Sequence, residues 1–331
     1  ASAERRNAAG ARPGATRRAG VFCGHGFVAE LARWHRYVLH PAPARGTKFL
    51  RRSQFNLTGL CSMLVAAPAE DDAETHGMER KHFSDDDIAA FGQDGFIIVR
   101  GLLSADETEA VSEWSDEVEH WPEVPGRHMV YRETSVFEPE KRILQRIENI
   151  YPYHDGFHAL FDDDRVKGRV AELFGEPAML FKEKINFKYP GSEGFKHHQD
   201  QAAGWWDYGT LFISALISID EATLENGCLE IAPGDARHRH LEREWKPYSE
   251  EEIKAMPFTP VPTRPGDVIL FDSFVPHGSY PNLSDKRRRI LYVTYNRLAE
   301  GDHRIQYYAD KRKSYPPDCE REPGKEYVFR V

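Results

Sequence analysis

The chain beyond its first quarter shows regular patterns of apolar and polar positions. Ser84 stands three residues before Asp87, and Ser104 stands three residues before Glu107. A small hydroxyl residue followed by an acid at this spacing is typical of a helix N-terminus. Between the two predicted helices, residues 96–99 form a short apolar run rich in isoleucine and valine, which predicts a strand.

The following part of the chain, up to about residue 296, is dominated by the shorter periodicity of β-strands. Residues 162–175 first predict one more helix, ended by Gly175. Short apolar runs then alternate with turns rich in Gly, Pro and Asn, and they predict strands within 179–191, 210–220, 227–234, 266–273 and 288–296. Many strands after an initial helical part indicate a mainly β fold, a sandwich or jelly roll with helices packed outside.

The first 77 residues differ from the rest in composition. They are rich in Ala, Arg and Gly and carry eleven Lys and Arg against six Asp and Glu. Three interpretations remain open: upstream sequence translated from a misplaced start, a disordered tail, or a targeting segment. We therefore expect residues 1–77 to be an N-terminal extension outside the fold, with Met78 or Met63 as the natural start if the first interpretation holds, and residues 78–331 to form one domain.

Charge and cysteine content exclude several classes of function. The whole chain has a formal net charge of −9, and its positive charge is concentrated in the first 77 residues, so the remainder is acidic. An acidic body disfavours nucleic acid as a partner. No apolar run is long enough to cross a bilayer. The four cysteines show no C-x-x-C pairing, which predicts a reducing, cytoplasmic location. The oligomeric state is left open.

The segment "FKHHQD" carries the first candidate for chemistry. His198 and Asp200 are two positions apart, a spacing that places both side chains on one face of an extended segment. With a second histidine from a later strand they would form the two-histidine, one-carboxylate set that holds Fe(II) and leaves positions open. His277, directly after the predicted strand in 266–273, is the strongest candidate. His197 has the opposite parity and is expected to face away.

A cosubstrate that chelates such a metal through an oxo-carboxylate needs a cation at its far end. Arginine suits this role because its guanidinium binds a carboxylate through two hydrogen bonds. The run "KRRR" offers three arginines; alternation groups Arg288 with Ile290 and Tyr292, and Arg287 with Arg289 on the other face. This spacing narrows the choice without deciding it.

Taken together, these motifs resemble the phytanoyl-CoA dioxygenase superfamily of Fe(II)- and 2-oxoglutarate-dependent oxygenases over residues from about 82 to 310. The matching pieces are "DGFIIVRGLLSADE", the His198–Asp200 motif, "NGCLEIAPGDARH" and "RPGDVILFDSFVPHGSYPNLSDKRRR". The resemblance implies a double-stranded β-helix of the jelly-roll, cupin-like kind. It also implies hydroxylation of an unactivated C–H bond, using O2 and coupled to decarboxylation of 2-oxoglutarate. The loop "DARH" departs from the plain Ser-His that the family has there.

The resemblance also implies roles for individual residues. His198, Asp200 and His277 would bind iron, and Ser279 with Arg288 would bind the distal carboxylate of 2-oxoglutarate. The segment "KINFKYPGSEGFKHHQD" is similar to the corresponding strand of ectoine hydroxylases. That similarity adds two candidate contacts to 2-oxoglutarate or substrate, Asn186 and Lys182. Because Asp200 supplies a carboxylate that halogenating relatives lack, hydroxylation is favoured over halogenation.

The substrate is expected to be a small polar molecule. Trp205, Trp206 and Tyr208 could form an aromatic box for an ammonium group, although ordinary packing explains them equally well. A basic set could hold an anion or could be a solvated face; its members are Lys182, Lys184, Lys188, Lys196 and Arg297. The overall pattern resembles bacterial enzymes that hydroxylate organophosphonates such as 2-aminoethylphosphonate.

Other readings stay open at this point. The substrate could be another small zwitterion or an acyl-CoA. In a different class, the jelly roll could be a cupin-like metal-binding module without oxygenase activity. Such modules have more histidines on an early strand and need no arginine after the last ligand, so the set His198, Asp200, His277 and Arg288 favours the oxygenase.

Overall fold

A computed structural model describes residues 38–39, 80–238 and 245–327. Most of the predicted N-terminal extension therefore lies outside the described residues. The exception is a two-residue strand, β1 (Val38–Leu39), which pairs in parallel with the first strand of the body, β2 (Phe96–Val99). Within the described residues, twelve strands form two sheets.

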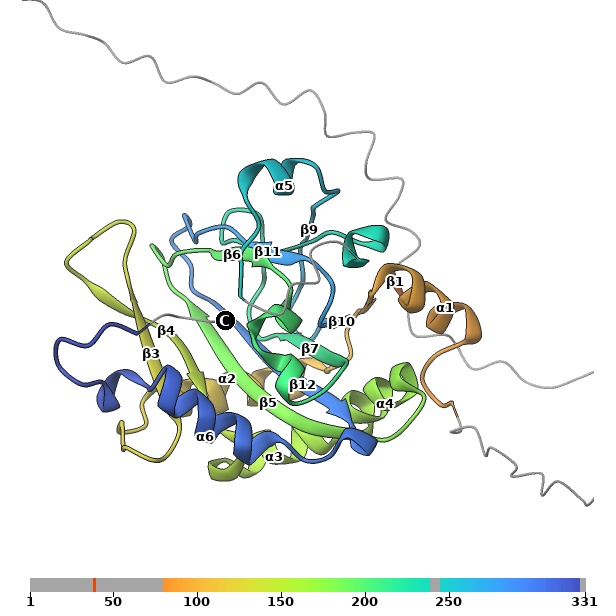
Figure 1. Ribbon diagram of the computed structural model, residues 1–331, viewed down its shortest axis with the longest axis horizontal. Helices are drawn as coiled ribbons and strands as arrows, with labels where there is room; N and C mark the ends of the chain where they lie inside the picture. Colours follow the sequence, from red (N-terminus) through yellow and green to blue (C-terminus); the bar gives the residue numbers. More distant parts are fainter. Residues whose placement is uncertain (1–37, 40–79, 239–244, 328–331) are drawn as a thin grey trace, which may run out of the picture. The chain divides into compact units, whose positions relative to one another are not determined.

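The larger sheet has eight strands in the order β1-β2-β10-β7-β12-β5-β4-β3, and all its pairs except β1 with β2 are antiparallel. Its remaining strands are β3 (Met129–Thr134), β4 (Arg142–Glu148), β5 (Ala178–Lys188), β7 (Phe212–Ser218), β10 (Val268–Asp272) and β12 (Arg288–Arg297). The long strands β5 and β12 lie side by side and span the body (Figure 1).

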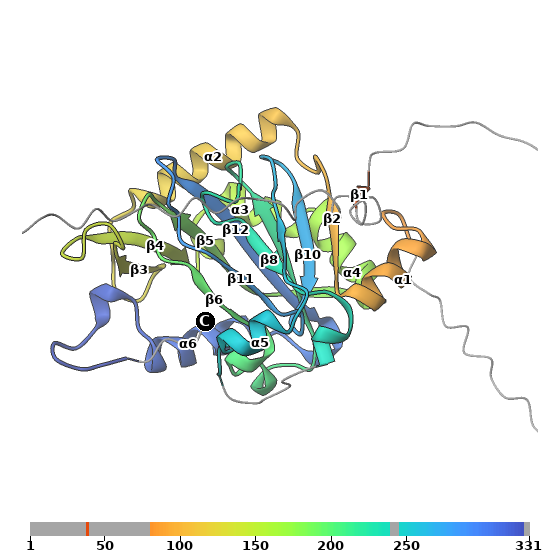
Figure 2. The same cartoon turned by 90° about the horizontal axis from the view of Figure 1, so that it is seen from above.

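The smaller sheet has four antiparallel strands in the order β6-β11-β8-β9. They are β6 (Phe195–His198), β8 (Leu229–Ile231), β9 (Thr259–Val261) and β11 (His277–Ser279). This sheet lies over one face of the larger sheet (Figures 1 and 2). The arrangement is the predicted jelly roll, a double-stranded β-helix.

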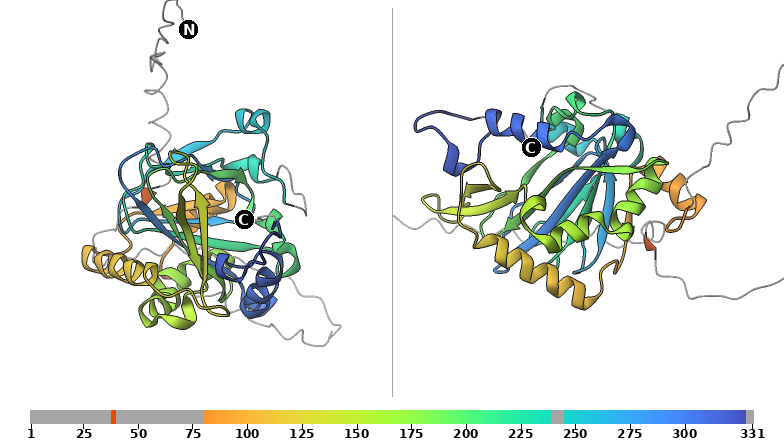
Figure 3. Two further views of the ribbon diagram at one scale, coloured as in Figure 1. Left: turned by 90° about the vertical axis from the view of Figure 1, so that its left-hand side faces the viewer. Right: turned by 90° about the horizontal axis from the view of Figure 1, so that it is seen from below.

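Helices cover the other face of the larger sheet. They are α2 (Ala105–Glu119), α3 (Asp155–Asp162) and α4 (Arg169–Phe174), and Figure 3 shows them across the strands. Their apolar side chains, including Val111, Phe157 and Val170, share one core with Ile185 and Leu291 of the sheet. The prediction of helices outside a β fold is thus confirmed.

The other helices lie at the periphery: α1 (Asp85–Asp94) next to β2, α5 (Glu250–Lys254) beside the smaller sheet, and α6 (Arg304–Ser314) beside β5. Ser84 and Ser104 form the predicted capping boxes, and Gly175 ends α4 in a left-handed conformation, φ 74°. No helix in the described ranges combines the length and the apolar character of a bilayer span.

Strand β5 has an unusual composition for a buried strand. Ile185 and Phe187 point to the helices and join the apolar core. The alternate positions 182, 184, 186 and 188 carry three lysines and an asparagine, all buried on the opposite face. The space between the two sheets is therefore polar and cationic, which is where the site lies.

Candidate active site

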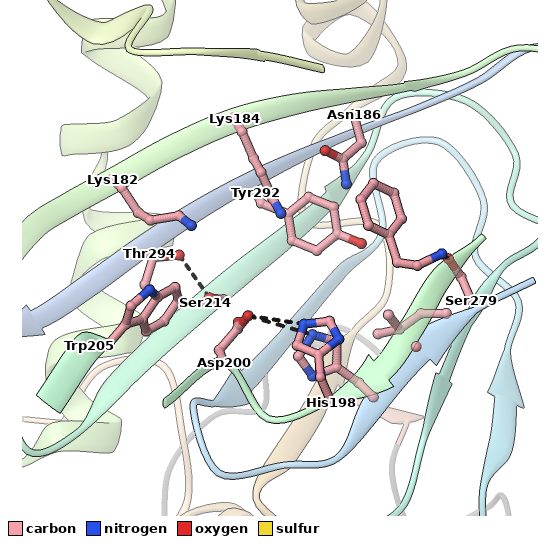
Figure 4. A pocket seen from close by; sticks show the side chains of 14 residues that line it. Lys182, Lys184, Asn186, His198, Asp200, Trp205, Ser214, Ser279, Tyr292 and Thr294 are labelled. Atoms are coloured by element: carbon pink, nitrogen blue, oxygen red, sulfur yellow. Dashed lines mark hydrogen bonds and ion pairs between the residues drawn. The ribbon is translucent and has the colours of Figure 1, made fainter. Parts of the chain in front are cut away.

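Three side chains from the predicted metal motif meet between the sheets. Strand β6 ends at His198, a turn that begins at Asp200 follows, and His277 begins β11, where it is the register partner of His198. The ligand atoms of these three residues all lie within 4.8 Å of one another. His198 Nε2 is 3.4 Å and His277 Nε2 is 3.9 Å from Asp200 Oδ1 (Figure 4).

Backbone carbonyls orient both imidazoles. The Nδ1 atom of His198 lies 2.5 Å from the carbonyl oxygen of Lys196, and that of His277 lies 3.0 Å from the carbonyl oxygen of Val275. A proton on Nδ1 that is donated to a carbonyl leaves the lone pair on Nε2, the atom that faces Asp200 in each ring. His198 Nε2 is buried and has no hydrogen-bond partner among the described residues.

The electrostatics favour the metal-binding forms of His277 and Asp200. Burial and the neighbouring His198 lower the pKa of His277 to about 4, so the ring is neutral at pH 7. Burial alone would raise the pKa of Asp200, but His277 and His198 lower it well below its usual range. Two imidazoles and one carboxylate, with inward lone pairs, fit a divalent metal such as Fe(II).

A cavity runs from these residues along the inner face of β5 and its neighbours. Figure 4 shows Asn186 and Ser279 toward one end of it, Lys182 and Trp205 toward the other, and Asp200 between them. The alternation of β5, β7 and β12 places these inward side chains, because the three strands pair in register.

At the Ser279 end the structure brings together three predicted residues. Lys188 is fully buried, and its ammonium donates to Ser279 Oγ at 2.9 Å and to the carbonyl of Tyr280 at 2.5 Å. Arg288 is buried opposite Lys188 in the β5–β12 register. Its guanidinium forms no ion pair with any carboxylate in the described ranges. Burial and nearby Arg288 lower the pKa of Lys188 to about 6.

Lys182 and Lys184 are the two lysines among the described residues that line the cavity, and they are 2% and 8% exposed. Their ammonium nitrogens lie over aromatic rings, Lys182 at 4.7 Å from the centroid of Trp205 and Lys184 at 5.0 Å from that of Tyr292. Neither ammonium makes a hydrogen bond or ion pair to a described residue. Burial, with the charge of Lys182, lowers the pKa of Lys184 to about 7. Buried cations in this state favour an anionic ligand.

The buried carboxylate opposite Lys184 in the β4–β5 register already has two other cationic partners. Glu148 on β4 is fully buried and accepts from Lys311 on α6 at 2.6 and 2.8 Å and from Arg146 Nε at 2.6 Å. Burial would raise its pKa, yet Lys311 and Arg146 hold the pKa well below the usual range. Its hydrogen bonds are thus made to these two cations, and it forms no ion pair with Lys182 or Lys184.

The predicted aromatic box is not assembled. Trp205 lines the cavity, but its ring face is occupied by Lys182. Trp206 packs on Phe274 at a centroid distance of 5.6 Å, and Tyr208 donates to Asp310; neither lines the cavity. Residues 200–203 and 205–207 form two 3-10 turns, which send successive side chains in different directions. The structure therefore does not bring these three rings together around the cavity.

Two of the predicted basic residues also lie elsewhere. Lys188 is next to Ser279 instead of on the cavity wall, and Arg297 pairs with Glu176 at 3.5 Å on another part of the body. His197 faces away from the triad, as expected, and its Nε2 is 2.8 Å from Glu230. Lys196 is exposed and lines a second cavity that adjoins the first at Phe195 and His198.

Sequence reasoning missed several lining residues, four of which are polar or contact the triad. Tyr292 and Thr294 follow Arg288 at even spacing, so alternation could have found them. Ser214 on β7 is 2.8 Å from Thr294, hydroxyl to hydroxyl, a contact that only the sheet pairing reveals. Trp245 packs edge-on against His198 at 5.0 Å and lines the second cavity; no sequence pattern pointed to it.

Comparison with known proteins agrees with this geometry. The sequence profile described as "Phytanoyl-CoA dioxygenase (PhyH)" matches residues 91–290. The chain belongs to this family. Among curated relatives, 2-aminoethylphosphonate dioxygenase from an uncultured bacterium is 40% identical over 74% of this chain and 94% of its own length. Methylphosphonate hydroxylase from Gimesia maris is 38% identical over 70% of this chain and 88% of its own length.

Solved structures show the same fold in the family. The crystal structure of EctD from S. alaskensis with 2-oxoglutarate and 5-hydroxyectoine superposes with a TM-score of 0.57 at 24% identity, covering 68% of this chain and 80% of that one. The predicted family, fold and enzyme class are confirmed: the protein is a dioxygenase of the PhyH family that depends on iron and 2-oxoglutarate.

Proposed function

We propose that this protein hydroxylates a small organophosphonate, with 2-aminoethylphosphonate as the best candidate, using Fe(II), 2-oxoglutarate and O2. The observation that carries the proposal is the pair of buried, unpaired ammonium groups of Lys182 and Lys184 beside the His198–Asp200–His277 triangle. A phosphonate dianion would offset both charges. The two curated relatives named above act on phosphonates by name, which supports the same substrate class here.

His198, Asp200 and His277 would hold the iron. Bound Fe(II) supplies the chemistry that couples the oxidative decarboxylation of 2-oxoglutarate to hydroxylation of a C–H bond. The chain's own part is to orient the two imidazoles, through the carbonyls of Lys196 and Val275, on the same side as Asp200, so that the other side stays open to the cosubstrate and oxygen.

Arg288 and Ser279 would bind the distal carboxylate of 2-oxoglutarate. Arg288 is a buried guanidinium without a carboxylate partner among the described residues, and Ser279 Oγ is held near it by Lys188. Asn186 lines the cavity between this end and the triad (Figure 4). We assign Asn186 to 2-oxoglutarate because of this position, with its side-chain amide N–H groups as the donors to the anion.

The setting proposed for the enzyme follows from the same features. A small molecule is the only partner that the proposal requires. Cys228 and Cys319, the two cysteines in the described ranges, are free, in keeping with a reducing, cytoplasmic location.

The test is succinate formation by anaerobically purified protein starting at Met78, supplied with Fe(II), 2-oxoglutarate and oxygen. The panel contains 2-aminoethylphosphonate, its N-methylated analogues, methylphosphonate, ectoine and an acyl-CoA. We expect succinate and a hydroxylated product with the phosphonates, and loss of both in His198→Ala. A folded protein that forms succinate with ectoine or the acyl-CoA but with no phosphonate would overturn the proposed substrate class.

A further inference from the structure

We infer that the phosphonate group of the substrate binds at the Lys182 end of the cavity, against the Lys182 ammonium and the Ser214 and Thr294 hydroxyls. This inference rests on the proposed function and adds the place and orientation of the substrate. It also decides between the two roles, cosubstrate contact or substrate contact, that the sequence leaves open for Lys182.

The first step is the order of side chains along the cavity. Lys182, Lys184, Asn186 and Lys188 follow each other on one face of β5, and their partners on β12 are Thr294, Tyr292, Ile290 and Arg288. At about 3.4 Å per residue, Lys182 and Lys188 are about 20 Å apart along the strand. Such a length exceeds that of one small ligand, so the two ends of the row can contact different ligands.

The second step is the position of the triad between the two ends. Figure 4 shows Asp200 pointing into the middle of the row, with Ser279 and Asn186 on one side of it and Lys182 on the other. The Arg288 end has the unpaired guanidinium that suits the distal carboxylate of 2-oxoglutarate. The end left for the substrate is the one formed by Lys182, Ser214, Thr294 and Trp205.

The third step is the chemistry of that end. The Lys182 ammonium is buried and lies 4.7 Å from the ring centroid of Trp205 and 5.4 Å from that of Tyr307, so two aromatic faces hold the cation in place. Its N–H groups have no acceptor among the described residues. Ser214 and Thr294 form a hydroxyl pair at 2.8 Å, in which one proton bridges the two oxygens and the other remains free to donate.

The same end disfavours an ammonium group. The faces of Trp205 and Tyr307 are already occupied by a lysine cation. Among the described residues that line this cavity, Asp200 is the only carboxylate, and it belongs to the triad. Hydrogen-bond donors, the Lys182 ammonium and a hydroxyl of the Ser214–Thr294 pair, therefore meet here without an available carboxylate. The group that fits is an oxyanion with several acceptor oxygens, such as a phosphonate.

The orientation has a consequence for specificity. With the phosphonate at Lys182, the carbon that carries phosphorus lies nearest to Asp200, and the rest of the substrate extends away from Lys182. Recognition then depends on the phosphonate more than on the amine. We expect methylphosphonate and N-methylated 2-aminoethylphosphonate to be substrates, and β-alanine, which replaces the phosphonate by a planar carboxylate, to be a poor one.

The experiment compares substitutions at the two ends of the row. Lys182→Met removes the ammonium and keeps the length of the side chain; Lys188→Met makes the same change at the opposite end. We expect Lys182→Met to raise the KM for 2-aminoethylphosphonate about ten- to a hundred-fold, the cost of one lost charge-assisted hydrogen bond, while the KM for 2-oxoglutarate stays within about twofold. Lys188→Met is expected to show the reverse pattern.

A second variant protects the test against misfolding. Thr294→Val keeps the shape of the side chain and removes its hydroxyl, and it should raise the KM for the phosphonate about fivefold without changing that for 2-oxoglutarate. The inference is overturned if Lys182→Met and Thr294→Val both leave the phosphonate KM unchanged, or if either acts on 2-oxoglutarate instead. If the unsubstituted enzyme turns over no phosphonate, the proposed function itself is wrong, which is a separate outcome.

Discussion

Lys184 is the inward lysine whose charge depends most closely on its neighbours. Burial is the main cause that lowers its pKa to about 7, and Lys182 on the same strand adds to the effect. Asp200 and Glu148 act in the opposite direction, whereas Arg146 acts in the same direction as Lys182. At neutral pH the side chain of Lys184 is therefore close to the midpoint of its titration, with the charged and neutral forms in similar amounts. Binding of an anion is then coupled to its proton.

We predict that affinity for the phosphonate falls as the pH rises through about 7. Lys184 is charged below its pKa, so the attraction is present at lower pH and is lost as the proton leaves. The measurement is the KM for 2-aminoethylphosphonate from pH 6 to 9 at saturating 2-oxoglutarate. Lys184→Met is the control, because ionisation of the substrate itself affects the KM of both proteins in the same way. A pH profile of KM that is identical in both proteins would contradict the prediction.

The residues that the sequence identified, and those it missed, differ in how local their signals are. His198, Asp200, His277 and Arg288 stand in motifs readable along a single segment. Trp205 and Trp206 also stand in one segment, but the directions of their side chains depend on the two 3-10 turns that begin at Asp200. The sequence pattern does not predict these turns. Ser214 became visible only through the pairing of β7 with β12.

At the scale of elements, strands β6 and β11 define the spacing of the two histidines. Gly278 lies between His277 and Ser279, and a Cβ built there would be 2.7 Å from Cδ2 and 2.9 Å from Cα of His197. His197 is itself held by Glu230, so it has little freedom to move. The close approach of the two strands therefore depends on the missing side chain.

We predict that Gly278→Ala weakens metal binding by about ten- to a hundred-fold, because it pushes β6 from β11 and displaces His198 relative to His277. Titration of the purified protein with Fe(II) without oxygen measures the effect, with circular dichroism to confirm the fold. Gly92→Ala is the matched control, since a Cβ there meets nothing within 4 Å. Equal affinity in both variants would show that the spacing is not controlled at Gly278.

The contact of α6 with the sheet is a second feature at this scale. Lys311 reaches from the helix to the buried Glu148, which also binds Arg146. Glu148→Gln would remove the carboxylate that these two cations share. We predict a loss of about 3–5 kcal/mol in the free energy of unfolding, measured by urea denaturation. Glu250→Gln, in an exposed pair with Lys254, should leave the unfolding curve unchanged; so small an effect in Glu148→Gln would refute the prediction.

For the whole molecule, the sequence predicted the class of fold well because its signals are local and repeated. Short sequence segments are enough to predict the helix caps at Ser84 and Ser104 and the strands bounded by turns. Short segments do not predict the division into two sheets, because it depends on which distant strands pair. Strand β10, for example, pairs with both β2 and β7. The family resemblance supplied that arrangement.

The N-terminal extension tests the proposed domain boundary. We predict that removing residues 1–77 changes the melting temperature by no more than about 2 °C and leaves succinate formation intact, because the described part of that segment is the two-residue strand β1, which pairs at the edge of the sheet. Differential scanning fluorimetry of both lengths of chain measures this. A drop of more than about 5 °C would mean that β1 and its surroundings belong to the fold.

The acceptors that orient His198 and His277 are main-chain oxygens of Lys196 and Val275, each two positions before its ring. No side-chain substitution can delete a carbonyl. The Lys182 end of the cavity, by contrast, is lined by the side chains of Lys182, Ser214 and Thr294, which lie outside the triad and can be exchanged. A protein built in this way can acquire a new substrate by single mutations while its oxygen chemistry continues. Members of the family can therefore diverge in substrate while they keep the iron ligands in place.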